Sequence, residues 1–316
     1  MQQNKSAHNM ETLDVESVLE QPPCPLCQSK QAHAVFEGQD DWVPDGKAGR
    51  RRFLVVRCEG CGAHYTTPRF RESKKQFAFS GSYPFYQRAR QNSSDPTEMH
   101  LRPFDRRINL LERVHPQPGS ILDLGMGDGL FLAAMRQRGW QTTGIDSEAD
   151  VVTYARQRLG LSSSFVADAE LDPFPEGMFN VVTMWGMLQL TYHPHQLLKK
   201  VKAVLVPDGV IAIGVANISG AGARLFGSHW HGLGLPRHLI HFDPNSLRRL
   251  VEETGFRIHA IEFDTPYWII RPSVLASLPL PGILGGIVRR LVYSVLSLGG
   301  RTRLGDTMIL IAKVER

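Results

Sequence analysis

The sequence predicts an α/β protein with a mainly parallel sheet, preceded by a small cysteine-bearing module. Three observations support this prediction. From Ser120 onward, short apolar runs alternate with segments of helical spacing, as in repeated βα units. A glycine-rich turn joins the first apolar run to the first helix. All four cysteines of the 316-residue chain lie within residues 21–70, as two C-x-x-C pairs.

The elements of the α/β part are expected in regular succession. Strands are expected at 121–124, 142–146, 163–168, 179–185 and 210–216, where apolar residues cluster. Helices are expected at 129–138, 149–159, 195–205 and 243–254. The last helix begins with a capping aspartate and Pro244, and Gly255 ends it. Two closing strands are expected at 257–263 and 307–314.

Composition divides the chain into four regions: a flexible leader (1–20), the cysteine module (21–70), a helical linker (71–118) and the α/β domain (119–316). Hydrophobic residues make up 42% of the chain, which suits a packed core, and the formal net charge of +5 is a mild bias. The N-terminus lacks the basic and apolar regions of a secretory signal, and no uncharged apolar run suits a membrane-spanning helix of roughly 20 residues. We therefore expect a cytoplasmic protein without a transmembrane segment.

The glycine-rich turn lies in the segment ILDLGMGDGLFL, residues 121–132. Glycines at 125, 127 and 129 allow a tight turn and a close approach of a ligand to the backbone. The helix N-terminus beyond them favours an anionic group. A dinucleotide site is one interpretation, but its pattern requires glycine at position 130, which is leucine here. An ordinary glycine turn is the other.

Acidic residues end the next two strands. Asp146 ends the second strand, where a carboxylate can accept hydrogen bonds from both hydroxyls of a ribose. Asp168 ends the third strand, where it can accept a hydrogen bond from an adenine amino group. Each acid alone could be a solvated residue at a strand end, whereas the acids and the glycine turn together favour a bound nucleoside.

The run D-x-G-x-G-x-G from Asp123 resembles the first motif of the class I S-adenosylmethionine (SAM)-dependent methyltransferases. This resemblance covers about residues 100–264 and the closing strand. It implies a Rossmann-like sheet with helices on both faces, SAM as the cofactor and methyl transfer as the activity. In that family the first aspartate helps to hold the amino end of the methionine part, and the glycine loop packs beneath the cofactor. The SAM-binding residues implied here are Asp123, Gly125, Gly127, Gly129, Asp146, Asp168, Ala169 and Trp185.

The sequence departs from that family after the fourth strand. Many relatives have a Leu-Glu-His run there, whereas this chain has Leu188-Gln189-Leu190. The aspartate that usually begins the strand is Asn180. Any role of the missing histidine is therefore not carried over, while the three SAM motifs are intact.

The cysteine pairs are Cys24 with Cys27 and Cys58 with Cys61. Two such knuckles supply four thiolates, which make a closed, structural tetrahedral zinc site. Two disulfides are the alternative, which the missing secretion signal disfavours. We expect removal of this zinc to leave SAM affinity nearly intact, because the two sites are expected in separate domains.

The cysteine segment and the stretch after it are similar to a group of methyltransferases in which a zinc ribbon precedes the SAM domain. Some members of that group modify sugars or other small metabolites. The same resemblance implies that Tyr83 and Tyr86 cover the cofactor, although packing between the domains is an equal alternative.

Residues 217–242 follow the fifth strand, at the edge where ligands bind in open α/β sheets. We expect this glycine-containing loop to act as a lid over the acceptor. Its His238 or His241 is the expected general base, and the alternative is that both histidines are structural. Residues 271–303 are apolar and basic, and we expect a helical insertion that either covers the sheet, makes a dimer contact or grips a lipid-linked or phosphate-bearing substrate.

The expected function is methyl transfer from SAM to a small-molecule acceptor, such as a sugar or a polysaccharide or natural-product intermediate. One alternative is an RNA methyltransferase that grips nucleic acid with the zinc module, although no RNA-binding pattern with interleaved aromatic residues is evident. The other is a non-catalytic SAM-binding protein.

Overall fold

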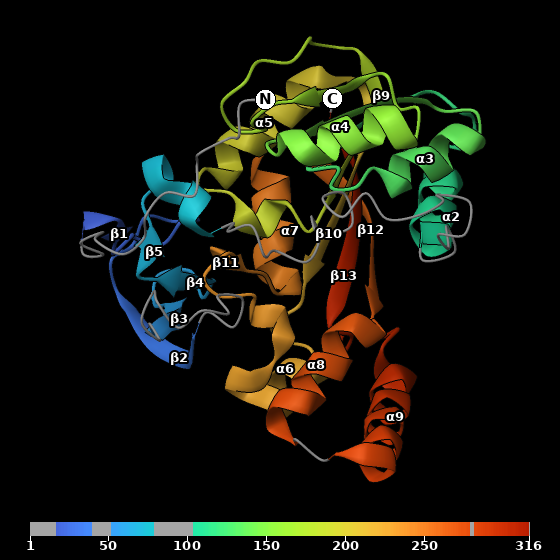
Figure 1. Ribbon diagram of the computed structural model, residues 1–316. Helices are drawn as coiled ribbons and strands as arrows, with labels where there is room; N and C mark the ends of the chain where they lie inside the picture. Colours follow the sequence, from blue (N-terminus) through green and yellow to red (C-terminus); the bar gives the residue numbers. More distant parts are fainter. Residues whose placement is uncertain (1–16, 40–51, 79–103, 279–280, 316) are drawn as a thin grey trace, which may run out of the picture.

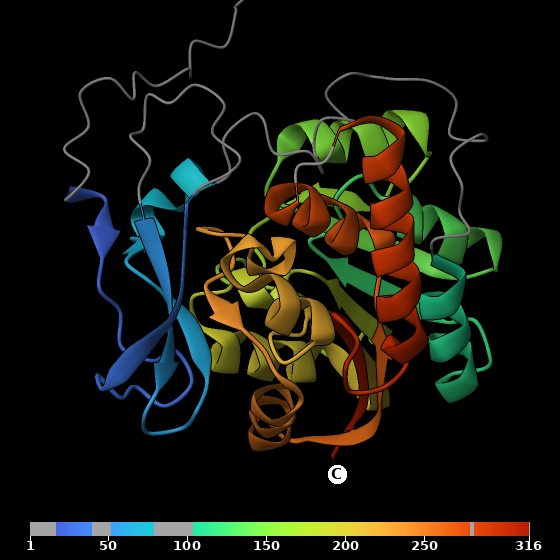
Figure 2. The same cartoon turned by 90° about the horizontal axis from the view of Figure 1, so that it is seen from below.

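The computed structural model describes residues 17–39, 52–78, 104–278 and 281–315. A seven-stranded sheet forms the centre of the larger, C-terminal part, and a smaller sheet lies beside it in the N-terminal module (Figure 1). Seen from below, the N-terminal strands form a separate layer that faces the segments following the fifth strand of the large sheet (Figure 2). Tyr83 and Tyr86, which were expected to cover the cofactor, lie outside the described residues.

The large sheet has the strand order β12-β13-β10-β9-β6-β7-β8. The strands are β6 (Ser120–Leu124), β7 (Gln141–Asp146), β8 (Ser164–Val166), β9 (Phe179–Trp185), β10 (Leu205–Ala216), β12 (Phe256–Asp264) and β13 (Thr307–Val314). Neighbours from β10 to β8 are parallel, whereas β13 is antiparallel to both β10 and β12. All seven lie where the sequence predicts them, within a few residues at each end.

Helices cover both faces of the large sheet. Side chains of successive strand residues point to opposite faces, so Ile121 packs with one hydrophobic cluster and Leu122 with another. The Ile121 side holds α2 (Asp105–Val114), α3 (Leu130–Gln137) and α4 (Ala149–Arg158); the Leu122 side holds α5 (Pro194–Val204) and α7 (Pro244–Glu253). This arrangement confirms the predicted α/β class and the Rossmann-like sheet with helices on both faces.

The N-terminal module has a sheet of its own, in the order β11-β4-β3-β2. Its strands are β2 (Ala32–Gln39), β3 (Arg52–Cys58), β4 (His64–Thr67) and β11 (Ile240–His241). β11 comes from the C-terminal part of the chain, and Ile240 pairs with Tyr65. The module and the α/β domain are therefore joined by a shared sheet, which the division of the sequence at residue 70 did not predict.

The expected flexible leader ends earlier than residue 20. Leu19–Glu20 form β1, which pairs with β5 (Arg69–Phe70). Val18 is buried, and Arg69 Nε donates a 2.8 Å hydrogen bond to Glu20 Oε1. These contacts fix residues 17–20 against the module, and they depend on partners about 50 positions away in the sequence.

The segment 217–242 is folded and largely buried, which corrects the expectation of an open loop. It forms α6 (Ala221–Phe226), two 3-10 turns, η6 (Gly227–His229) and η7 (His231–Leu233), and then β11. Phe226, Trp230 and Leu235 join a cluster with Phe53 of the module. Apolar side chains distributed among the glycines let the segment pack between the module and the large sheet.

Two helices are inserted between β12 and β13. They are α8 (Tyr267–Ser277) and α9 (Gly282–Gly299), and both pack beside α6 (Figure 1). Among the described residues, no helix has the length and the apolar character needed to cross a bilayer.

Candidate active site and metal centre

Three acidic residues gather at the carboxyl edge of the parallel strands. Asp123 lies in β6, Asp146 is the last residue of β7, and Asp168 follows β8 by two residues. Because β6, β7 and β8 are parallel neighbours, their carboxyl ends meet at one edge of the sheet. The structure thus brings together the acids that the sequence singled out.

The glycine turn is held directly by Asp146. The carboxylate of Asp146 accepts hydrogen bonds from the backbone N–H groups of Gly127 and Glu148, each at 3.0 Å. Gly125, Gly127 and Gly129 all have positive φ, as the tight turn requires. Burial raises the pKa of Asp146 to about 6, although these two hydrogen bonds partly offset the effect. A side chain at Gly127 would meet no atom within 4 Å, so the turn is open on that side.

Asp123 is buried more deeply, at 1% exposure. Its Oδ1 accepts a 2.6 Å hydrogen bond from Thr183 Oγ1 of β9. Burial raises the pKa of Asp123 to about 7, while this hydrogen bond and the charge of Arg107 act to lower it. The charge of Asp146 also raises the pKa of Asp123.

Arg107 of α2 belongs to this site, although the sequence analysis did not identify it. Its guanidinium lies 4.7 Å from the ring centroid of Trp185, over the ring face. Burial lowers the pKa of Arg107, whereas the charges of Asp123 and Asp264 act to raise it. Trp185 Nε1 is buried without a hydrogen-bond partner among the residues that the structure describes. A buried cation and an unpaired donor beside Asp123 suit a charged, polar ligand.

Asp168 is paired with a residue of the segment that directly follows the module. Lys75, in the 3-10 helix η3 (Glu72–Ala78), forms an ion pair and a hydrogen bond with Asp168 Oδ2. This hydrogen bond and the charge of Lys75 lower the pKa of Asp168, while burial opposes them. The neighbouring Ala169 is buried, and its carbonyl accepts a 3.1 Å hydrogen bond from Lys200 Nζ. No local signal marks Lys75, because its partner lies 93 residues further along the chain.

His238 lies in a fixed hydrogen-bond chain. Gln189 Oε1 accepts from the backbone N–H of Ala216 at 3.0 Å, so its Nε2 is free to donate to His238 Nε2 at 2.8 Å. His238 Nδ1–H then donates to the carbonyl of Gly232 at 3.0 Å. Gln189, which departs from the family pattern, is thus the residue that orients His238.

His241 is tied to the module. Thr66 of β4 donates a 2.6 Å hydrogen bond to the carbonyl of His238, and Thr66 Oγ1 lies 2.9 Å from His241 Nε2. Burial lowers the pKa of His238 to about 4 and that of His241 well below its usual value. A general base works best with a pKa near the working pH, so these environments favour structural roles.

We expect His238→Ala to lower the free energy of unfolding by about 1–3 kcal/mol, because the Gln189 amide loses its buried acceptor. Denaturant unfolding would measure this loss, and His259→Ala, at an exposed position on β12, is the matched control. Unchanged stability combined with normal SAM binding and a turnover loss of roughly 10²–10⁴-fold would instead identify His238 as the general base.

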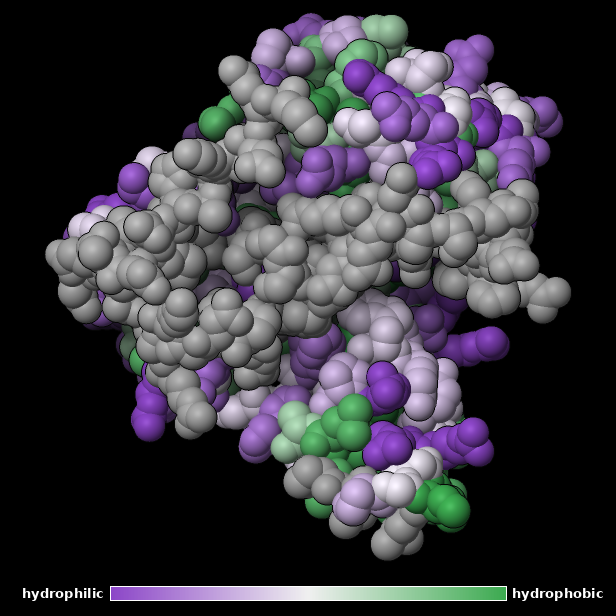
Figure 3. Space-filling model, in the orientation of Figure 1, coloured by the Kyte–Doolittle hydropathy of each residue, from purple (hydrophilic) through white to green (hydrophobic). Residues whose placement is uncertain are grey.

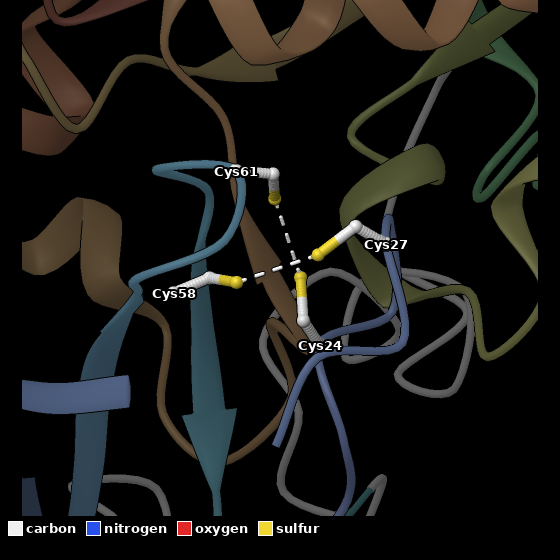
Figure 4. A group of neighbouring side chains, drawn as sticks. All are labelled: Cys24, Cys27, Cys58 and Cys61. Carbon is white, nitrogen blue, oxygen red and sulfur yellow. Dashed lines mark hydrogen bonds between the residues drawn. The ribbon is translucent and has the colours of Figure 1, made fainter. Parts of the chain in front are cut away.

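The four cysteine side chains lie close together in the fold, although they come from two knuckles that are separated by 30 residues in the sequence. Their sulfur atoms all lie within 4.8 Å of one another. Cys24 Sγ faces Cys61 Sγ at 3.6 Å, and Cys27 Sγ faces Cys58 Sγ at 3.4 Å (Figure 4). A tetrahedral ion with 2.3 Å bonds to sulfur needs edges of about 3.8 Å, whereas a disulfide needs about 2.05 Å. The cluster therefore has the spacing of a four-thiolate metal site, and the disulfide alternative does not fit.

The cysteine cluster is anchored to the α/β domain. Arg249 of α7 donates a 3.1 Å hydrogen bond from Nη1 to the carbonyl of Cys61. Cys24 and Cys58 are buried with Val56 and Tyr65 in a small apolar cluster of their own. The second knuckle thus contacts both β4 and a helix that covers the large sheet.

Solved structures of known methyltransferases share this fold. A 1,6-didemethyltoxoflavin-N1-methyltransferase of Burkholderia thailandensis, solved with its substrate and S-adenosylhomocysteine, aligns with 85% of this chain and 97% of its own at a TM-score of 0.53 and 16% identity. A SAM-dependent methyltransferase of Archaeoglobus fulgidus aligns with 73% of this chain and 99% of its own, at a TM-score of 0.50 and 18% identity.

Sequence relatives cover a shorter part. A ubiquinone biosynthesis O-methyltransferase of Actinobacillus pleuropneumoniae is 30% identical over 107 residues, which are 31% of this chain and 45% of that protein. The corresponding protein of Haemophilus ducreyi is 33% identical over 106 residues, with the same coverage. This chain thus spans about half the length of the curated relatives it matches.

One family model, described as Methyltransferase domain, matches residues 96–261. The match includes the glycine turn, the three acids and the segment that carries His238. Because it spans more than half of the chain, the protein belongs to the methyltransferase domain family.

Proposed function

We propose that this protein transfers a methyl group from SAM to a small-molecule acceptor. The observation that carries the proposal is the set of three acids at the carboxyl ends of β6, β7 and β8, around an open glycine turn, in a chain of this family. Asp146 would accept hydrogen bonds from the ribose hydroxyls, and Asp168 would accept one from the adenine amino group. SAM would supply an electrophilic methyl group, and the protein would align the acceptor with it in a site shielded from water.

The methionine part of SAM fits the other end of the site. Asp123, when ionised, is suited to the ammonium group, and the Arg107 guanidinium is suited to the carboxylate. Trp185 Nε1 offers an additional donor that has no partner among the described residues. We therefore propose Arg107 as a cofactor-binding residue in addition to those that the sequence predicted.

An oxygen acceptor is favoured, because the curated relatives are named O-methyltransferases. A sugar or a natural-product intermediate remains within this proposal. His238 and His241 are proposed to shape the acceptor side of the site, with His238 fixed by Gln189 and His241 by Thr66. The general-base role stays a prediction for the variants described above.

The RNA-methyltransferase alternative has less support. Three of the basic side chains in and beside the module that it would use are engaged with acids: Arg52 with Glu37, Arg69 with Glu20, and Lys75 with Asp168. Arg71 donates a hydrogen bond to the carbonyl of Ser17, and Lys74 is a further basic residue of this set. The further basic residues Lys47, Arg50 and Arg51 lie outside the described residues. RNA binding that falls steeply with salt would restore this alternative.

We also propose that Cys24, Cys27, Cys58 and Cys61 bind one structural zinc ion per chain. The sulfur spacing described above supports this proposal, as does the closed set of four ligands, which leaves no position for a reacting water. Metal analysis of protein purified without chelators is the test.

SAM affinity is expected to fall at least tenfold between pH 7 and pH 5, and the loss of charge at Asp146 alone accounts for about tenfold. Asp146 has a pKa of about 6 and is mostly protonated at pH 5, where it cannot serve as a charged acceptor. Hydrogen bonds from the ribose hydroxyls favour the ionised carboxylate of Asp146. Below pH 6, Asp146 must therefore lose a proton when SAM binds, and the free energy of that deprotonation weakens binding. Calorimetric titrations at several pH values would measure the effect. Asp146→Asn should reduce the pH dependence and leave the part that comes from Asp123, whose pKa is about 7.

Stability is a less direct measure of the same group. The raised pKa of Asp146 makes the folded state bind more protons than the unfolded state between about pH 4 and pH 6, so its contribution to stability falls as pH rises. The depressed pKa of His238 has the opposite effect between about pH 4 and pH 6.5. Binding therefore reports on Asp146 more clearly than unfolding does.

The function itself is tested with methyl-labelled SAM below saturation and a panel of hydroxyl-bearing acceptors, with Asp146→Ala as the control whose SAM binding is weakened. Transfer of label that depends on Asp146 would support the proposal. Tight SAM binding without transfer to any acceptor would favour the non-catalytic alternative, and absence of SAM binding would exclude both.

A further inference from the structure

Helices α8 and α9 form a lobe that is apolar on its outer surface. The inner side of the lobe is an ordinary apolar packing surface, in which Ile269, Ile270 and Val274 of α8 are buried against the cluster that includes Trp230. The ring of Tyr267 meets the ring of Tyr293 at 5.1 Å and joins the two helices. Because these contacts already pack α8 and α9 against each other and against the rest of the protein, the outer apolar side chains are not needed for that packing.

A stripe of exposed apolar residues runs along the outer side of α9. It consists of Ile283 (85% exposed), Ile287 (50%), Leu291 (60%), Val295 (67%) and Leu298 (86%). The spacings of four, four, four and three residues place all five on one side of the helix. Since α9 has 18 residues, the stripe is about 25 Å long. Val292 and Leu296 lie on the opposite side and pack against the lobe's own core.

Helix α8 adds exposed apolar residues of its own. Trp268 is 52% exposed, and Leu275 and Leu278 are also exposed. Trp268, Arg271 and Leu275 occupy positions i, i+3 and i+7, which share one side of the helix, and Leu278 directly follows its last residue. In the space-filling view, green hydrophobic groups and purple hydrophilic groups lie side by side on the lobe formed by these helices (Figure 3). Monomeric proteins rarely expose apolar patches of this extent without a binding partner.

The lobe is also strongly basic. Residues 265–305 contain no Asp, Glu, Lys or His, and their charge comes from Arg271, Arg289, Arg290, Arg301 and Arg303. The formal net charge of the whole chain is +5, and this segment alone contributes +5, so the charges of the remaining residues sum to zero. Apolar side chains, an exposed tryptophan and arginines in a segment that contains no acidic residue are the combination that binds the interface of an anionic bilayer.

A second copy of the chain fits this surface less well. In a two-fold symmetric dimer the same patch meets itself, so the exposed Arg271, Arg290, Arg301 and Arg303 of one copy would face those of the other. The segment supplies no carboxylate to compensate that repulsion, whereas anionic phospholipids supply phosphate groups. No described helix can cross a bilayer, so contact is expected at the membrane surface.

We propose that the outer side of α8 and α9 docks this protein onto membranes that contain anionic phospholipids. Exposed apolar residues insert among the lipid chains near the headgroups, and the arginines contact lipid phosphates. The lobe also contacts the acceptor side of the site, since the backbone N–H of His231 donates a 2.9 Å hydrogen bond to Ser273 Oγ of α8. Docking itself is independent of the proposed methyl transfer.

Co-sedimentation with vesicles tests the proposal. The full chain should sediment with vesicles of equal parts phosphatidylcholine and phosphatidylglycerol, and much less with phosphatidylcholine alone. The double variant Leu291→Asp/Leu298→Asp should lose at least tenfold in partitioning. Each of Arg290→Ala, Arg301→Ala and Arg303→Ala should lose about fivefold, because a basic residue near an anionic surface contributes about that factor.

Met178→Glu is the matched control, because Met178 is 55% exposed, close to Leu291 at 60%, but lies before β9, outside the lobe. Thermal unfolding and SAM binding would verify that the variants are folded. Three results would overturn the proposal: no binding to anionic vesicles, equal binding to neutral vesicles, or binding unaffected by the variants. A lipid-free dimer that the double variant converts to a monomer would reassign the surface to self-association.

Discussion

Replacement of Cys58 by serine is expected to abolish tight zinc binding and to unfold the N-terminal module. Structural zinc sites in small peptides have apparent binding free energies of about 10–16 kcal/mol, and losing one of four thiolates removes most of that. The module's own apolar cluster is small and includes Cys24 and Cys58 themselves. Little else would hold the two knuckles together.

The structure also predicts that this variant weakens SAM binding. The sequence analysis expected SAM affinity to stay nearly intact, because the sites were assigned to separate domains. However, β4 of the module pairs with β11, Thr66 hydrogen-bonds the carbonyl of His238, and Lys75 contacts Asp168. Unfolding of the module would remove these contacts from the acceptor and adenine sides of the site.

Metal analysis, far-ultraviolet circular dichroism and SAM calorimetry would measure the three effects. His33→Ala is the matched control, since His33 is exposed beside the second knuckle and supplies none of the four sulfur atoms. The coupling between module and site would be disproved if Cys58→Ser lost zinc and kept its SAM affinity. Zinc content equal to that of the unsubstituted protein would disprove the metal assignment itself.

The strands of the large sheet were predictable because their signal is local. Buried parallel strands read as short apolar runs, and ILDL at 121–124 is followed at once by the glycine turn that a ligand-binding edge requires. Asp146 and Asp168 were found by the same rule, since each follows such a run. The cysteine site was predictable from spacing alone, because four thiolates in two knuckles have few other uses.

The remaining features depend on partners that are distant in the sequence. Glycines in residues 217–242 indicated a loop, but the pairing of β11 with β4 and the burial of Trp230 decide its structure. Arg107 gives no local signal, because its role depends on Asp123 and Trp185 lying beside α2 in the fold. Likewise, a sequence cannot distinguish a histidine that acts as a general base from a structural one. The burial of His238, which lowers its pKa, and its fixed hydrogen bonds appear only in the fold.

Replacement of Asp146 by alanine is expected to weaken SAM binding by about 1–3 kcal/mol, which is roughly 5–150-fold in Kd. Two effects add. The ribose hydroxyls lose a charged acceptor, and the N–H groups of Gly127 and Glu148 lose the carboxylate that holds the glycine turn in place. Asp146→Asn keeps one acceptor oxygen for the turn, so its loss should be smaller, and the difference between the variants estimates the contribution of the turn.

Glu176→Ala is the control for this comparison, because Glu176 is an exposed acid in the segment before β9. Isothermal calorimetry gives the affinities, and denaturant unfolding shows whether the turn has also lost stability.

Asp146 is buried, so its replacement removes a carboxyl group whose pKa is raised, and this relief of desolvation offsets part of the lost hydrogen bonding in the SAM-free protein. The alanine variant should therefore lose more in SAM affinity than in stability. An affinity equal to that of Glu176→Ala would remove Asp146 from the cofactor site, and with it the main support for SAM bound at this edge of the sheet.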